Sequence, residues 1–305
     1  MDIYLPIAGM SVYAPLIILL GFAVGMLSGM FGVGGGFLTT PLLIFYGIPP
    51  TVAVASATTQ IAGASVTGVM AHFRRKGVDV AMGGVMIVGG AIGSLLGSVL
   101  FRFLQKSGQI DLFIGILYVV LLGSIGLLML RDALVTLGWM EAPRPRTTPV
   151  RAKHNKWVAA LPMRWRFYAS GLYISPLAPL LLGVISGVLT VLLGVGGGFI
   201  LVPAMIYILR MGARAVVGTS LLMMLATSAI TVVVHAMTTH AVDIVLAILL
   251  LIGGVFGAHA GTLLATRLKP DILRLALAVM ILAVGIRMLL GLAWQPSEIY
   301  SVQTL

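Results

Sequence analysis

The stretch GMFGVGGGFLTTP, residues 29–41, interrupts an apolar run that is otherwise long enough to cross a membrane. Inside a helix, glycine costs about 1 kcal/mol and proline about 3 kcal/mol relative to alanine. Three consecutive glycines followed by Pro41 therefore predict a break in a helix at membrane depth. The pattern returns as LLGVGGGFILVP at residues 192–203, so the chain makes this break twice.

The composition around these breaks is that of an integral membrane protein. Of the 305 residues, 60% are hydrophobic and 9% are charged, whereas soluble domains are about 45–50% apolar and about 25% charged. Apolar runs of roughly 18 residues or more are candidate membrane spans. They occur near residues 13–31, 51–72, 80–101, 111–130, 172–193, 215–237, 243–265 and 272–292. We therefore predict an all-α polytopic membrane protein.

The chain consists of two copies of one unit. The hexapeptide GVGGGF occurs at residues 32–37 and 194–199, an offset of 162, and Pro41 and Pro203 keep the same offset. A stretch rich in proline and basic residues separates the copies. We divide the chain into a first transmembrane repeat, a basic linker and a second transmembrane repeat, at residues 13–131, 132–170 and 171–292.

The distribution of Lys and Arg favours copies that are inverted relative to each other. Arg287 lies within the last span and is left out of the counts. With four crossings in each copy and the linker in the cytoplasm, 11 of the other Lys and Arg residues lie inside and 7 outside. If each glycine-rich segment turns back within the membrane, each copy crosses an odd number of times, and the count becomes 16 inside and 2 outside. The positive-inside rule favours the second arrangement, which puts both termini outside and makes residues 37–46 a short re-entrant arm.

The glycine runs are candidate anion sites. Irregular backbone at membrane depth lines a wet cavity or is buried in protein, and matched breaks in inverted repeats are typical of a transporter's binding site. Successive glycine N–H groups at the start of a helix can form a nest for an anion. The alternative is that the glycines only allow tight packing. The predicted N–H donors are Gly34, Gly35, Gly36, Gly196, Gly197 and Gly198.

Polar residues after each break are the second group of candidates. Ser and Thr in a membrane helix commonly bond to backbone carbonyls or join helices, so each one alone is weak evidence, whereas a glutamine inside a span needs partners. We expect five of them to line the substrate site: Thr58, Thr59, Gln60, Thr219 and Ser220. His259 lies within a span, where an ionisable group suggests function, and we consider it for proton coupling.

Other features have structural interpretations. Asp79 and Asp243 each precede a span and are expected to be helix N-caps. Tandem GxxxG spacings at 21/25/29, 89/93/97 and 253/257/261 allow close helix packing. The chain has no cysteine, so disulfides, thiolate metal sites and cysteine nucleophiles are excluded. We find neither paired carboxylates nor HExxH or GxSxG motifs in the spans, and we expect no catalytic residues, metal or cofactor.

The doubled motif, SGMFGVGGGFLTTPLLI followed by AVASATT and LTVLLGVGGGFILVPAMI followed by AVVGTSL, resembles the TauE/SafE family of sulfite exporter-like permeases. The resemblance covers nearly all of both halves. It implies a multi-pass transporter of the bacterial inner (plasma) membrane for small anions, such as sulfite or other sulfur-containing anions.

The leading hypothesis is therefore a secondary transporter that works by alternating access around a midplane site. Two alternatives are an anion channel and a transporter of a small carboxylate without sulfur. The expected partners are a small anion and the lipid bilayer, and we assign the net charge of +11 to membrane orientation rather than to nucleic acid binding. The sequence leaves the oligomeric state open.

Overall fold

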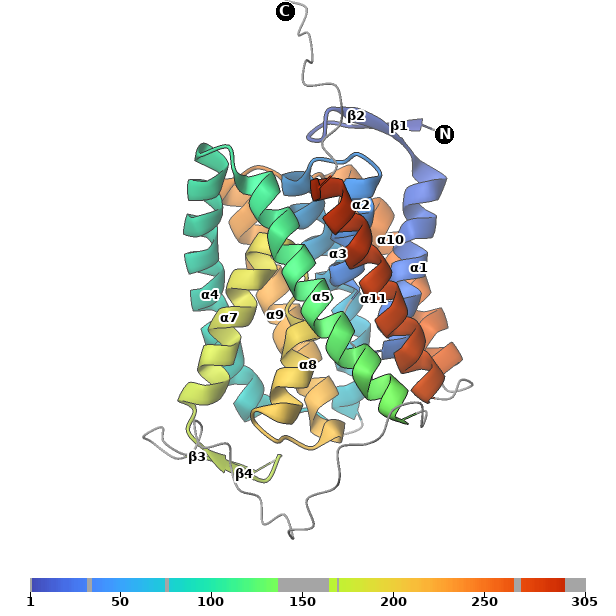
Figure 1. The fold of residues 1–305 in the computed structure, drawn as a ribbon. Helices are drawn as coiled ribbons and strands as arrows, with labels where there is room; N and C mark the ends of the chain where they lie inside the picture. The colour runs from blue at the N-terminus through green and yellow to red at the C-terminus, as the bar shows by residue number, and fades with distance from the viewer. Residues whose placement is uncertain are drawn as a thin grey trace, which may run out of the picture.

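The computed structural model describes residues 2–31, 35–74, 77–136, 165–168, 170–265 and 270–293. These residues form ten α-helices and two short β-hairpins (Figure 1). The interior of the linker, residues 137–164, lies outside the described residues. The architecture is that of an all-α polytopic membrane protein, as the sequence predicts.

The two halves have the same order of elements. The first half contains β1 (Asp2–Leu5), β2 (Met10–Tyr13), α1 (Ala14–Phe31), α2 (Gly36–Phe45), α3 (Pro50–Arg74), α4 (Val80–Lys106) and α5 (Ile110–Thr136). The second half contains β3 (Trp165–Phe167), β4 (Leu172–Ile174), α7 (Leu177–Leu193), α8 (Gly198–Tyr207), α9 (Ala213–Thr238), α10 (Ile244–Ala265) and α11 (Pro270–Ala293). The two hairpins lie at opposite ends of the helix bundle (Figure 1).

Helix length separates spans from arms. Within the described residues, six helices are long and apolar enough to cross a membrane, namely α3, α4, α5, α9, α10 and α11. The remaining helices form two pairs. α1, with 18 residues, is followed by the arm α2, and α7, with 17 residues, is followed by the arm α8; each arm has 10 residues. Ten helical residues rise about 15 Å, half of a hydrocarbon core of about 30 Å. Each arm therefore reaches only halfway through.

Each arm turns back toward the end of the bundle where its preceding helix began. The backbone N–H of Tyr13, just before α1, donates to the hydroxyl of Tyr46, just after α2, at 3.2 Å. In the second half, Phe167 and Ile174 of the hairpin before α7 share one buried cluster with Met205 of α8. The helix, the glycine break and the arm thus form a helical hairpin inside the bundle.

Glycines bring two pairs of helices from different halves into backbone contact. Cβ atoms added at Gly21, Gly25 and Gly29 of α1 would lie 2.8, 2.3 and 2.2 Å from carbonyl oxygens of α10. Cβ atoms added at Gly89 and Gly93 of α4 would lie 2.2 and 2.1 Å from carbonyl oxygens of α7. Both pairs, α1 with α10 and α4 with α7, pack along their lengths. The GxxxG spacings serve close helix packing, as predicted.

Two buried aspartates fasten the hairpins to the bundle. Asp79 caps α4 by accepting the N–H of Met82 at 3.0 Å, and its second oxygen accepts the N–H of Ser170 in the turn between β3 and β4, also at 3.0 Å. Asp243 likewise accepts an N–H in the first turn of α10 at 3.1 Å and the N–H of Ile7, between β1 and β2, at 3.0 Å. Both predicted N-caps are confirmed, and each also holds a hairpin from the other half.

Candidate functional site

The glycine breaks adopt backbone that favours glycine. Gly194 ends α7 with φ of 66°, and Gly196 and Gly197 follow with φ of 71° and 74°. Side chains other than glycine are disfavoured in this left-handed region. At the first break, Gly35 precedes α2 in helical conformation with φ of −70°. Gly34, one of the predicted donors, lies outside the described residues.

The two breaks meet in the centre of the bundle. The rings of Phe37 and Phe199, which follow the two glycine runs at equivalent positions, stack with centroids 4.5 Å apart and planes 11° apart. A Cβ added at Gly36 would lie 2.6 Å from the carbonyl oxygen of Gly194. Ile61 of α3 would contact Cβ atoms added at Gly36 and at Gly196. Two segments 162 residues apart thus form one buried centre.

Polar side chains from neighbouring helices hold the end of α7 at its break. The Tyr118 hydroxyl of α5 donates to the carbonyl oxygen of Leu193. His235 of α9 places Nε2 3.1 Å from the carbonyl oxygen of Val191. The last carbonyls of a helix have no partner within it, so these contacts fix where α7 stops and the break begins.

Several buried hydroxyls have no hydrogen-bond partner among the described residues. They belong to Ser56, Ser186, Thr227 and Ser228. A fifth, Thr40, lies beside the Tyr118 phenol without a well-formed hydrogen bond to it. Buried polar groups are nearly always paired, and an exception calls for an explanation such as a ligand or water. None of these side chains is among the residues predicted from the sequence to line the substrate site.

Two of these hydroxyls lie at the second break. The Ser186 Oγ of α7 lies 1.7 Å from the position that a Cβ on Gly197 would take, and the Ser228 Oγ of α9 lies 3.4 Å from the corresponding position on Gly196. At the first break, the residue that corresponds to Ser186 is Val24, whose Cγ1 lies 2.5 Å from a Cβ added at Gly35. Two unpaired hydroxyls therefore lie at the second break. At the first break Val24 takes the place of Ser186, and the Thr39 hydroxyl beside Gly35 is already bonded within the protein.

The helix that follows the second break presents unsatisfied N–H groups. Gly197 caps α8 without a side-chain hydrogen bond, and Gly198 and Phe199 are buried. The N-terminus of a helix carries a partial positive charge and attracts anions. No described group of three or more His, Cys, Asp or Glu side chains is placed to hold a metal ion. The local chemistry is therefore that of N–H and O–H donors, which suits an anion.

The polar residues predicted on α3 and α9 have partners within the protein. Thr58, Thr59 and Ser220 donate to carbonyls three or four residues earlier in their own helices, at 2.7, 3.4 and 2.9 Å. Thr219 accepts the backbone N–H of Asp79 at 2.9 Å, close to the start of α4. The structure does not bring these four residues together at one point.

Gln60 lies closer to the first break. Its Oε1 accepts the hydroxyl of Thr39 on α2 at 2.8 Å, and its Nε2 donates to the carbonyl oxygen of Gly21 on α1 at 3.4 Å. The amide thus joins α3 to α1 and α2, the two helices of the first helical hairpin. His259 is exposed on α10, whereas the residues around the breaks are buried.

Comparison with known proteins agrees with this architecture. The family model described as "Sulfite exporter TauE/SafE" matches residues 17–288. A "Probable membrane transporter protein" from Xylella fastidiosa (strain Temecula1) is 30% identical over 272 residues, covering 88% of this chain and 90% of that protein. The "Probable membrane transporter protein YjnA" of Bacillus subtilis is 30% identical over 281 residues, covering 90% and 98%.

No solved structure matches the chain significantly. The family match spans both glycine breaks and most of both halves, and the relatives match over nearly their whole length. The chain has the apolar helices of an integral membrane protein, and the family is one of membrane permeases rather than enzymes. The chain therefore belongs to the TauE/SafE family of membrane transporters.

Proposed function

We propose that this transporter carries a small anion, either sulfite or a small organosulfonate, and binds it between the two glycine breaks. The observation that carries the proposal is the meeting of both breaks at the Phe37–Phe199 stack, beside buried hydroxyls that lack partners. The relatives' names give no substrate, whereas the family's name refers to sulfite. We infer the substrate class from that name and from the N–H and O–H donors at the second break.

In this proposal the second break makes the main contacts. N–H groups of Gly196, Gly197 and Gly198 and the hydroxyls of Ser186 and Ser228 donate to the oxygens of the anion. Hydrogen bonds to a charged group contribute about 1.5–3 kcal/mol each, so two or three of them suffice for specific binding. Gly34, Gly35 and Gly36 provide a weaker counterpart, because Val24 takes the place of Ser186 there and the Thr39 hydroxyl is already bonded to Gln60.

The other predicted residues contribute in a different conformation. Thr58, Thr59, Gln60, Thr219 and Ser220 all have internal partners in this conformation. Their contact with the anion would require α3 and α9, which pack against each other, to shift during transport. His259 stays a candidate for proton coupling.

The packing suggests which parts move. Helices locked by glycine contacts cannot slide past each other without separating their backbones, and the locked pairs join different halves. We infer that α1 and α10 with the β1–β2 hairpin form one rigid unit, and α4 and α7 with the β3–β4 hairpin form the other. Alternating access would then tilt these intertwined units about α3 and α9, rather than moving one sequence half against the other.

The inverted arrangement predicts on which side of the membrane the two termini and the linker lie. The opposite placement of the two hairpins (Figure 1) and the distribution of Lys and Arg both support an odd number of crossings in each half. Reporter tags at both termini should be accessible from outside the cell, and a tag inserted in the linker, residues 137–164, should be cytoplasmic. A cytoplasmic C-terminus would contradict the inverted arrangement.

The unpaired hydroxyls give a direct test of the binding site. Ser186→Ala should raise the KM for sulfite about tenfold, because one hydrogen bond to a charged group is lost. Its thermal stability should stay unchanged or rise slightly, since no hydrogen bond within the protein is broken. The measurement is the concentration dependence of uptake into proteoliposomes, together with the unfolding temperature in detergent.

Ser94→Ala is the matched control. The Ser94 hydroxyl lies 3.1 Å from that of Thr231 and is equally buried, so its removal should lower stability by about 1 kcal/mol and leave KM unchanged. If Ser186→Ala behaves like Ser94→Ala, with lower stability and normal KM, the hydroxyl at the second break does not bind the anion.

A further inference from the structure

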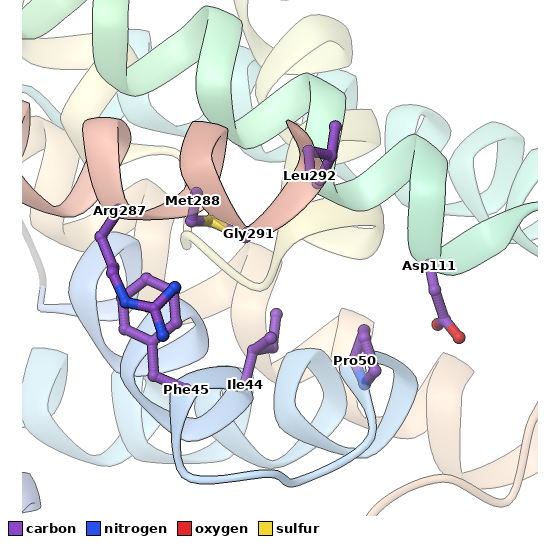
Figure 2. A pocket seen from close by; sticks show the side chains of 9 residues that line it. Ile44, Phe45, Pro50, Asp111, Arg287, Met288, Gly291 and Leu292 are labelled. Carbon is purple, nitrogen blue, oxygen red and sulfur yellow. The ribbon is translucent and has the colours of Figure 1, made fainter. Parts of the chain in front are cut away.

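A pocket lies at the end of the bundle that carries the β1–β2 hairpin, away from the glycine breaks. It has a volume of about 280 Å³ and is formed by the end of α2, the start of α3, the start of α5 and the end of α11. Figure 2 shows Arg287 on one side of it and Asp111 on the opposite side. No residue of the pocket belongs to the site proposed above.

Arg287 lines this pocket, and its guanidinium forms no hydrogen bond with the residues that the structure describes. The guanidinium carbon lies 5.0 Å from the centroid of the Phe45 ring, a cation–π contact. Within the described part of the chain, Arg287 forms no ion pair. A guanidinium carries five N–H donors in a planar fork that matches the oxygens of a carboxylate, sulfonate or phosphate group. The ring fixes the fork's position and leaves its edge open to a ligand.

We propose that this pocket is a second oxyanion site, in which Arg287 binds the anion on its way to or from the glycine breaks; this role rests on the transport function proposed above. Asp111, on the opposite wall (Figure 2), disfavours a second negative charge through repulsion. The preferred ligand is therefore a small oxyanion with a single negative charge.

The arm α2 connects the two sites. Phe45 is its last residue, and Phe37 lies in its first turn. Eight residues of helix separate them, a distance of about 12 Å. An anion at Arg287 would thus lie at one end of the arm whose other end contributes to the central stack.

The corresponding place at the opposite end of the bundle has different chemistry. Tyr207 is the last residue of α8 and occupies the position 162 residues after Phe45. Its hydroxyl donates to the Asp132 carboxylate of α5 at 2.9 Å. An aromatic residue thus ends each arm, but it contacts a cation at one end and a carboxylate at the other. Among the described residues, the Arg287–Phe45 contact has no counterpart at the end of α8.

The oxyanion could be free in solution or part of a phospholipid headgroup, and one experiment separates these sources. Binding of radiolabelled sulfite is measured by equilibrium dialysis on the full chain in maltoside detergent, at a mildly acidic pH where the singly charged hydrogensulfite predominates. Co-purified phospholipid is measured by mass spectrometry. The variant is Arg287→Met. The control is Arg102→Met, which removes an exposed arginine on α4 that has no aromatic partner among the described residues.

For a free anion, the wild type and Arg102→Met should bind two sulfite ions per chain, and Arg287→Met only one. For a lipid headgroup, the wild type should retain one phospholipid that Arg287→Met loses. Either result supports the oxyanion site. Equal sulfite and phospholipid in all three proteins would overturn it.

The two proposals fail in different ways. If the wild type binds one sulfite that Arg287→Met loses completely, the pocket is the oxyanion site and the proposed central site is wrong. If the wild type and Arg287→Met each bind one sulfite, with an affinity that falls about tenfold in Ser186→Ala and no difference in phospholipid, the central site stands and the pocket binds no oxyanion.

Discussion

Replacing Gly197 with alanine should reduce sulfite uptake at least tenfold while the protein still inserts into the membrane. The φ of 74° at this position costs a non-glycine residue about 1–2 kcal/mol. In addition, the new Cβ would lie 1.7 Å from Ser186 Oγ and 3.0 Å from Ser186 Cβ. The backbone of the second break must therefore shift and displace the N–H groups that we assign to the anion.

Gly84→Ala is the matched control, because a Cβ at this position on α4 meets no atom within 4 Å. It should leave uptake and stability unchanged or raise stability slightly, since alanine is the better helix former. The measurement is initial uptake into proteoliposomes, normalised to inserted protein. Normal KM and normal uptake in Gly197→Ala would contradict the assignment of the second break as the binding site.

Substitution of Asp79 should release the β3–β4 hairpin and destabilise the protein. The Asp79 carboxylate is buried and accepts the N–H of Met82 together with the N–H and hydroxyl of Ser170. Loss of a cap costs about 0.5–2 kcal/mol, and the unpaired N–H of Ser170 adds about 1–3 kcal/mol. Asp79→Ala should therefore lower stability by roughly 2–4 kcal/mol.

Asp79→Asn separates the two roles of this side chain. Its amide oxygen can still accept the N–H of Met82, but its NH₂ group cannot accept from Ser170. The helix cap should survive while the hairpin is released, so trypsin should cleave after the exposed Arg166 faster than in the wild type. Asp132→Asn, at an exposed carboxylate, should change neither property. Unaltered cleavage after Arg166 in Asp79→Asn would show that this aspartate does not fasten the hairpin.

Local sequence patterns predicted the helices, the breaks and their packing. Six of the eight predicted apolar spans form helices long enough to cross a membrane, whereas those near residues 13–31 and 172–193 form the shorter helices α1 and α7. The glycine spacings of α1 and α4 and the caps at Asp79 and Asp243 are confirmed. Each of these depends on a periodicity or a residue type with a local physical cause, namely the width of the bilayer, the lack of a side chain, or a carboxylate before a helix.

The two hairpins were not predicted, because their stability comes from distant contacts. Their strands have only three or four residues, too few for a hydrophobic period to be recognised. What fixes them is the burial of Leu5 and Val12 at one end of the bundle and of Phe167 and Ile174 at the other, together with the two aspartates. Only the folded bundle brings these partners together.

The proposed binding site likewise combines features with a local sequence signal and features that depend on distant contacts. The glycine runs could be located from sequence, whereas Ser186 is one of two hydroxyl residues in an apolar helix and is recognisable only by its contact with Gly197. A comparison of the two halves could have pointed to Ser186, because this serine stands at the position equivalent to Val24, at the offset of 162 residues. By contrast, Thr58 and Ser220 stand out in sequence but bond to their own helices, a common use of these residues.

The most direct test of the central claim is uptake of radiolabelled sulfite into proteoliposomes that contain only this protein. The account predicts saturable uptake that excess unlabelled sulfite inhibits and that Gly197→Ala reduces at least tenfold. Uptake that rises linearly with concentration would indicate a channel rather than a transporter with a closed site. No uptake of sulfite, with uptake of a small carboxylate instead, would contradict the proposed sulfur-containing substrate.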